Sequence, residues 1–281
     1  MTLSRVLKPY LQVYHFMGVI DHPYGSHRLL RKIPASIIGL FLLLTQLTGL
    51  HEIIILMRSE WDVSDRLLLG MIAALGFIQV VLTLSLSVFQ RQVIFEAQRI
   101  FLAVEDIFQK DLHWPQISYV QFKRGLHLCF FLLVFSWLQA VSFYALYNSF
   151  HLVTVSDYAK KVLHLFWTVL ISCFVLHSGT VTFFLNLLNS TIERDLKEFG
   201  YYNNNKIVVR NNAVVRSIKY KIRKYKLIHF HLWQSVQHIS AYFGWLFIPI
   251  FLNFFMTIFY STYWIAQVYR RRRSFEELLR E

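Results

Sequence analysis

The chain carries five long apolar stretches, and each is long enough to cross a lipid bilayer as a helix. They run over Ala35–Met57, Leu67–Phe89, Leu126–Tyr147, Val162–Leu188 and Ile239–Val268. The hydrocarbon core of a bilayer is about 30 Å thick and needs about 20 predominantly apolar residues per helix. With 56% hydrophobic and 16% charged residues in 281, one soluble domain could not bury five such helices. The sequence therefore predicts an all-α, polytopic helical membrane protein, a bundle of about five transmembrane helices with long cytoplasmic helix extensions.

The positive charges and the cysteines narrow the class further. A net charge of +13 would suggest nucleic acid as a partner in a soluble protein, but here Lys and Arg sit in loops and at helix ends. Membrane topology explains that placement better, so no nucleic-acid partner is expected. Cys129 and Cys173 both fall inside apolar stretches, which excludes a disulfide framework and gives no metal-binding spacing. Both thiols are expected to be small packing residues.

The distribution of Lys and Arg predicts the orientation. Residues 1–34 and 90–124 each contain five Lys and Arg residues, and residues 189–230 contain ten. The connections that alternate with these segments contain few Lys and Arg residues. Cytoplasmic loops are the ones enriched in Lys and Arg, so the N-terminus is predicted to be cytoplasmic and the first span to direct insertion. The tail that begins at Arg270 would then lie outside, against the rule.

The predicted domain organisation follows from these spans. Residues 1–34 form a cytoplasmic segment, residues 35–268 form one transmembrane domain with cytoplasmic helices at 93–110 and 189–238, and residues 269–281 form a basic tail. Within the first segment, Val6–His22 is typical of an amphipathic helix suited to the inner membrane interface. In the helix at 93–110, Ala97, Phe101, Val104 and Phe108 recur at helical spacing and predict one packing face.

Motifs for catalysis and metal binding are absent from the sequence. It contains no glycine-rich phosphate loop, no His-Glu-x-x-His zinc helix and no Gly-x-Ser-x-Gly nucleophile elbow. His164 and His177 would lie about 20 Å apart along one helix, at about 1.5 Å per residue, so they cannot share a metal. The sequence predicts neither an enzyme nor a cofactor or metal site. A small transporter is disfavoured because Pro249 is the only proline inside a span and no repeat pairs with it.

Three segments resemble the insect gustatory receptors of the arthropod seven-helix chemoreceptor superfamily. The run Leu7–Ile20 resembles the lead-in before the family's first span. The segment Phe183–Leu196 resembles the exit of its fourth helix, and Ile228–Gly244 is similar to the entry to its fifth. The resemblance covers nearly the whole chain but only the first five of the family's seven helices. It implies a receptor that binds a small tastant from outside the cell and opens a cation pathway as a homo- or hetero-oligomer, by resemblance a tetramer.

The chain departs from the family at its most specific motif, Thr-Tyr, five apolar residues and Gln-Phe in the seventh helix. The nearest string here, from Thr262 to Val268, is two residues too short and lies in the fifth stretch. In the family the seventh helix lines the pore, so the resemblance implies a truncated form that conducts only with further helices or partner chains. The tetra-arginine at 270–273 would then precede a missing sixth helix.

The resemblance places the family's ligand pocket between helices in the outer half of the bundle. In this chain the pocket would be lined by aromatic and polar side chains, as in other small-molecule sites. They come from the third, fourth and fifth spans: Trp137, Phe143, Tyr144, Phe166, Trp167, Asn253, Thr257 and Tyr260. For each residue alone, packing in the core or in an interfacial aromatic belt is the plainer interpretation.

The function predicted from the sequence is therefore a gustatory receptor subunit in the plasma membrane, multi-pass, with a cytoplasmic N-terminus. Its expected partners are a small tastant, other receptor subunits and membrane lipid, the last through the basic helix at 216–230. Two alternatives stay open. The chain could be a non-conducting accessory protein that associates through its cytoplasmic helices, or an odorant receptor of the same superfamily.

Overall fold

The computed structural model describes residues 2–16, 91–112, 119–148, 155–204 and 212–278, with isolated helical positions between residues 44 and 85. All the regular structure in this part of the chain is helical. The elements are α1 (Leu3–Phe16), α4 (Arg91–Asp106), the π-helical segment η1 (Ile107–Asp111), α5 (Val120–Asn148), α6 (Val155–Asn204) and α7 (Asn212–Leu278). The first two predicted spans lie largely outside the described residues.

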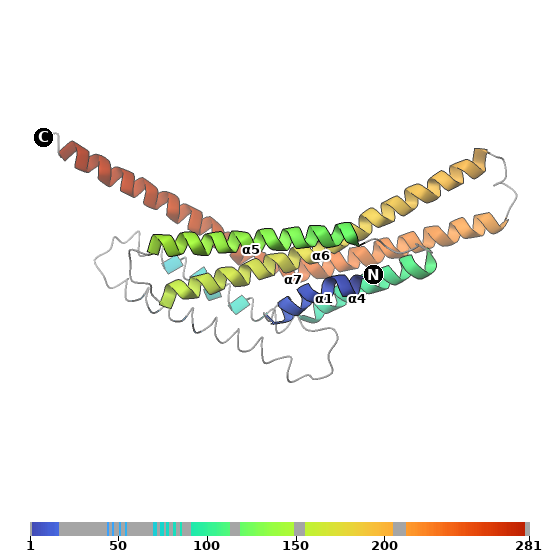
Figure 1. Cartoon of the computed structure of the whole chain (residues 1–281), viewed down its shortest axis with the longest axis horizontal. Helices are drawn as coiled ribbons and strands as arrows, with labels where there is room; N and C mark the ends of the chain where they lie inside the picture. The colour runs from blue at the N-terminus through green and yellow to red at the C-terminus, as the bar shows by residue number, and fades with distance from the viewer. Residues whose placement is uncertain are drawn as a thin grey trace.

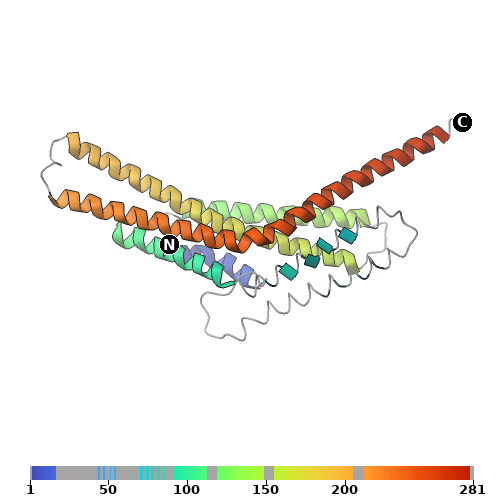
Figure 2. The same ribbon diagram turned by 180° about the vertical axis from the view of Figure 1, so that it is seen from behind.

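Two long helices organise the molecule. Figure 1 shows α6, 50 residues long, and α7, 67 residues long, side by side through the middle of the structure. In this view and from behind in Figure 2, α5 lies above α6, while α1 and α4 lie below the pair, with α4 along α7. Beyond the middle of the molecule, the last part of α7 diverges from the bundle.

Membrane-spanning character is evident in both long helices. Within the described residues, Trp167–Glu198 and Val215–Met256 are long and apolar enough to cross a bilayer. Large apolar side chains also stand exposed on α5 and α7, among them Phe131, Phe251 and Phe255, each more than 60% exposed. Such a surface is unfavourable in water and suits contact with lipid. The predicted fold class, a helical membrane protein, is confirmed. The assignment of residues 35–268 to one membrane domain stays a prediction.

The predicted packing face of the helix at 93–110 is confirmed by burial. Ala97, Phe101, Val104 and Phe108 are all at most 1% exposed. Their spacing of three or four residues places them on one side of α4 and η1, which packs against α7 and α6. Whether this helix lies in the cytoplasm stays a prediction.

The N-terminal helix packs one face against the rest of the protein. Leu3, Val6, Tyr10 and Tyr14 are buried on one face of α1. The Tyr10 hydroxyl also forms a hydrogen bond of 2.8 Å with Nδ1 of His127 on α5. Helices α4, α5 and α6 offer this face a surface to pack against. Whether residues 6–16 also lie along the inner membrane interface stays a prediction. Residues 17–22 of the predicted helix lie outside the described part.

Candidate functional site

The eight residues predicted to line a ligand pocket lie on three helices, α5, α6 and α7. The structure describes two of their side chains. Trp167 is buried at 5% exposure, and its indole ring lies 5.9 Å from the ring of Phe254 on α7, centroid to centroid. Trp137 on α5 is half-buried. Six side chains lie outside those described: Phe143, Tyr144, Phe166, Asn253, Thr257 and Tyr260.

Helices α5 and α6 pack against each other, as do α6 and α7, so the predicted residues sit on neighbouring helices. The Trp167–Phe254 contact brings the fourth and fifth predicted spans together at the height of the expected pocket. A pocket shared by all eight side chains stays a prediction.

A buried polar group links α4 to α6. His177 on α6 is 2% exposed, and its Nδ1 lies 2.7 Å from the carbonyl oxygen of Cys173. Its Nε2 lies 3.4 Å from Nε2 of Gln98 on α4, which is itself 6% exposed. Buried polar groups are normally paired, and this pair fixes the register of the two helices.

Glu105 is the second polar link and joins three parts of the chain. One carboxylate oxygen accepts hydrogen bonds from the backbone N–H of Leu3 at 2.9 Å, the hydroxyl of Tyr119 at 2.7 Å and the side-chain amide of Gln109 at 3.2 Å. Burial and the hydrogen bond to Glu105 raise the pKa of the Tyr119 phenol, so Tyr119 remains a donor at neutral pH. Glu105 therefore attaches the start of α1 and the entry to α5 to α4.

We expect Glu105→Ala to loosen the N-terminal helix. Hydrogen bonds to a charged acceptor contribute about 1.5–3 kcal/mol each, and the variant leaves the Leu3 N–H and the Tyr119 hydroxyl without their acceptor. Amide hydrogen exchange of peptides from α1 should speed up by at least roughly tenfold. Glu96→Ala is the matched control, because Glu96 lies on the same helix, is 47% exposed and forms a 3.8 Å ion pair with Arg99. Equal protection of α1 in both variants would contradict the role of Glu105.

A charged cluster joins α6 to the basic first part of α7. Asp195 is 2% exposed and accepts a short hydrogen bond from the hydroxyl of Tyr225, while Nζ of Lys221 lies 3.0 Å from the same carboxylate. Nε of Arg194 lies 3.5 Å from the other oxygen of this carboxylate. Burial alone would raise the pKa of Asp195, but the bonds from Tyr225 and Lys221 outweigh it and lower the pKa below its usual value. The aspartate is therefore a charged anchor for α7.

A second ion pair repeats this arrangement at the end of η1. Nζ of Lys224 on α7 lies 2.7 Å from the carboxylate of Asp111, and the Tyr220 hydroxyl donates to the same carboxylate at 3.1 Å. The hydrogen bond with Asp111 raises the pKa of Lys224. Four lysine or tyrosine side chains of α7, at positions 220, 221, 224 and 225, thus attach η1 and α6 to α7. Part of the basic charge of residues 216–230 is therefore paired with carboxylates of the protein itself.

Metal binding finds no support among the described residues, where no cluster of three His, Cys, Asp or Glu side chains could hold an ion. The arrangement provides apolar packing, an aromatic contact and polar links between helices.

Sequence reasoning missed the polar links, although a signal for them exists. Gln98 and Glu105 stand seven residues apart, beside the apolar stripe that includes Phe101 and Phe108. Polar residues on the buried side of a helix need partners, so their position predicts hydrogen bonds to neighbouring helices. The partners themselves, His177 and Leu3, lie far away in the sequence and carry no such signal.

Comparison with known proteins identifies the family. A family model described as 7tm chemosensory receptor matches residues 7–278, nearly the whole chain. No curated protein and no solved structure matches the chain. A match over this length, on a helical membrane fold, establishes that the chain belongs to the 7tm chemosensory receptor family.

Proposed function

We propose that the chain is a gustatory receptor subunit, which binds a small tastant from outside the cell and gates a cation conductance in an oligomer. Membership of a chemosensory receptor family supports a membrane receptor with a small-molecule ligand. The taste assignment, the plasma membrane location and the cytoplasmic N-terminus rest on the resemblance and on the distribution of positive charge. Other receptor subunits supply the rest of the conducting assembly.

The observation that carries this proposal is the continuity of α6 and α7. Trp167 lies near the predicted outer end of the fourth span and contacts Phe254 in the middle of the fifth, and Asp195 and Tyr225 meet near the predicted inner ends of these helices. On α6, 28 residues separate Trp167 from Asp195, or about 42 Å at about 1.5 Å per residue. A ligand that repacks the outer contact moves the same two helices that are anchored at the inner contact.

The predicted pocket has the chemistry that a tastant requires. Indole and phenyl rings provide rigid apolar faces on which sugar rings and alkaloid rings can lie, and Tyr, Thr and Asn side chains orient polar groups. A protonated alkaloid nitrogen over an aromatic face would also gain a cation–π contact. The buried Trp167 is the residue on which we place the largest share of ligand contact.

We expect Trp167→Phe to weaken the response to the tastant about tenfold, because it shortens the aromatic face while it keeps the site apolar. The measurement is the inward cation current in cells that express the chain with gustatory receptor subunits, at equal surface expression. Sucrose, caffeine and a volatile ester serve as probes. Trp233→Phe is the matched control, since Trp233 is 55% exposed on the early part of α7, remote from the predicted pocket.

The outcomes separate the alternatives. A response to sucrose or caffeine that shifts in Trp167→Phe and not in Trp233→Phe supports the proposal. A response to the volatile ester alone favours an odorant receptor. A chain that changes the currents of its partner subunits identically in wild type and Trp167→Phe is an accessory protein, and the proposed ligand role is wrong.

A further inference from the structure

One face of the first part of α7 combines exposed cations with exposed apolar side chains. We call this face the basic stripe, and its members are Val215, Arg216, Lys219, Ile222, Arg223 and Lys226. Their spacing keeps them on one side of the helix, at about 100° per residue. The opposite face of the same turns carries the ion pairs of Lys221 with α6 and of Lys224 with η1. Since all six members are exposed, the basic stripe is an open surface in the described part of the chain.

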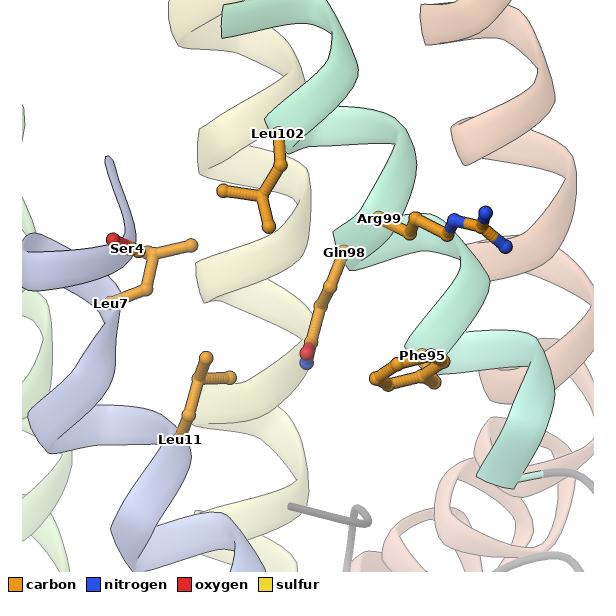
Figure 3. Close-up of a pocket in the computed structure, with 7 residues that line it drawn as sticks. All are labelled: Ser4, Leu7, Leu11, Phe95, Gln98, Arg99 and Leu102. Carbon is orange, nitrogen blue, oxygen red and sulfur yellow. The ribbon is translucent and has the colours of Figure 1, made fainter. Parts of the chain in front are cut away.

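The cations of the basic stripe have no counter-charge in the part of the chain that the structure describes. None of its four basic residues forms an ion pair with a described carboxylate. Other exposed cations differ in this respect. Arg99 of α4, which extends away from α1 in Figure 3, pairs with Glu96 at 3.8 Å. Lys110 of η1 pairs with Asp106 at 2.7 Å. Like charges three or four residues apart repel each other on a helix, so an acidic surface against the stripe is favourable.

The basic stripe lies too far from the hydrocarbon for lipid to be its partner. The apolar segment Val215–Met256 has 42 residues, or about 63 Å at about 1.5 Å per residue, which is twice the thickness of a bilayer core. Cations are costly in hydrocarbon, so the crossing part is the later one, predicted to begin at Ile239. Lys226 then lies about 20 Å and Arg216 about 35 Å before the hydrocarbon. The headgroup layer is about 5–8 Å thick and screening confines its attraction to about 8–10 Å beyond it.

The pattern of the stripe selects a helical partner. Positions 215, 219, 222 and 226 are spaced four, three and four residues apart, which is the contact spacing of two helices that pack side by side. In such a pairing, carboxylates of the partner lie against the lysines at two of these positions. Apolar side chains of the partner cover Val215 and Ile222, which are 52% and 47% exposed. A flexible polyanion would neutralise the cations but leave both apolar side chains in water.

We propose that the basic stripe docks an acidic amphipathic helix of a cytoplasmic protein. The carboxylates of this helix lie against Lys219 and Lys226, and its apolar residues lie against Val215 and Ile222. The stripe is about 17 Å long, so three helical turns of the partner cover it. Because the opposite face of the same turns anchors η1 and α6, the partner contacts the segment of α7 that joins the long helices. This inference rests on the cytoplasmic placement of the first part of α7 in the proposed function.

The first test compares two acidic peptides on the purified protein in nanodiscs of phosphatidylcholine, which leave both sides accessible. One peptide, of about 18 residues, repeats Glu and Leu at heptad spacing. The other is its scrambled isomer, which has the same net charge. Mass spectrometry follows the acetylation of Lys219 and Lys226, with the exposed Lys8 of α1 as the reference. We expect the heptad peptide to slow acetylation of the two stripe lysines, and not of Lys8, at concentrations about tenfold lower than its isomer. Equal protection by the two peptides would overturn the helical partner.

The second test separates charge from apolar contact. Arg223→Glu should weaken protection by the heptad peptide about tenfold, whereas Lys8→Glu, which changes the net charge equally on another exposed surface, should not. Ile222→Lys adds a positive charge and removes an apolar contact. It should therefore weaken the proposed docking, although it would strengthen a purely electrostatic attraction. Stronger protection in Ile222→Lys, or equal effects of Arg223→Glu and Lys8→Glu, would contradict the proposal.

A third measurement tests lipid as the occupant. The wild type is acetylated without peptide in nanodiscs of phosphatidylcholine alone and in nanodiscs that also contain phosphatidylserine. We expect equal rates at Lys219 and Lys226 in both, because the stripe lies beyond the reach of the headgroups. Slower acetylation with phosphatidylserine would make anionic lipid the occupant and overturn the protein partner. None of these measurements uses a tastant or a current, so they stand apart from the test of the receptor proposal.

Discussion

Asp195→Ala is expected to destabilise the junction of α6 and α7 strongly. The carboxylate is 2% exposed and is bonded to Tyr225 and Lys221. Removing one member of a buried charged network costs about 3–5 kcal/mol, and because Lys221 keeps 28% of its side chain exposed we place the loss near about 3 kcal/mol. The apparent Tm in detergent should fall by roughly 5–10 °C.

The matched control for this change is Asp106→Ala. Asp106 also pairs with a lysine, at 2.7 Å, but it is 54% exposed, and surface pairs contribute about 0–1 kcal/mol.

Asp195 should also make the stability of the folded protein depend on pH. Since the folded protein lowers the pKa of Asp195, its stabilisation is present above the unfolded value and is lost as pH falls through the folded value. The wild type should therefore lose its advantage over Asp195→Asn below about pH 4. An advantage unchanged in acid would show that Asp195 is not the stabilising charge.

Phe184→Ala is expected to have a comparable or larger effect through packing. Phe184 on α6 is fully buried, and its ring lies 6.0 Å from that of Phe108, 6.4 Å from that of Phe101 and 5.5 Å from that of Phe183, between centroids. Truncating a buried phenylalanine costs about 3–5 kcal/mol, because the ring contacts are lost and the cavity closes only in part. We expect the apparent Tm to drop by on the order of 10 °C.

Leu185→Ala provides the comparison, because it removes a neighbouring apolar side chain that is 36% exposed. Its cost should stay well below that of Phe184→Ala if the aromatic cluster stabilises the contact of α4 with α6. Thermal unfolding of the two variants in the same detergent measures the difference. Equal losses would mean that the cluster is not a site of tight packing.

The sequence predicted the helical elements well where the signal is periodic. The spacing of Ala97, Phe101, Val104 and Phe108 indicated a packing face, and all four side chains are buried. It could not predict what covers an apolar face. The stripe of α1 suited a lipid interface equally well, and only the tertiary arrangement shows that Leu3, Tyr10 and Tyr14 meet other helices.

Less of the candidate site than of the fold could be predicted from the sequence. The helical periodicity predicts that Gln98 faces inward. That its partner is His177 depends on the register between α4 and α6. Pairings across 79 residues of sequence are set by packing and leave no local pattern. For the tastant residues, the sequence places aromatic side chains on three helices. The structure adds one contact, Trp167 with Phe254.

The unbroken course of α6 constrains its length as well as its composition. One series of its buried positions recurs every three or four residues along one face: Leu170, Cys173, His177, Thr180, Phe184, Leu188, Thr191 and Asp195. One residue inserted at the middle of this series would turn everything beyond it by about 100°, so Asp195 would leave Tyr225 while His177 kept its place. Exposed side chains of α6 take no part in these contacts, whereas the number of residues from one contact to the next is fixed. The fixed spacing keeps the contacts at both ends of α6 on the same face of the helix. A one-residue insertion would break the contacts beyond it without altering any contact residue.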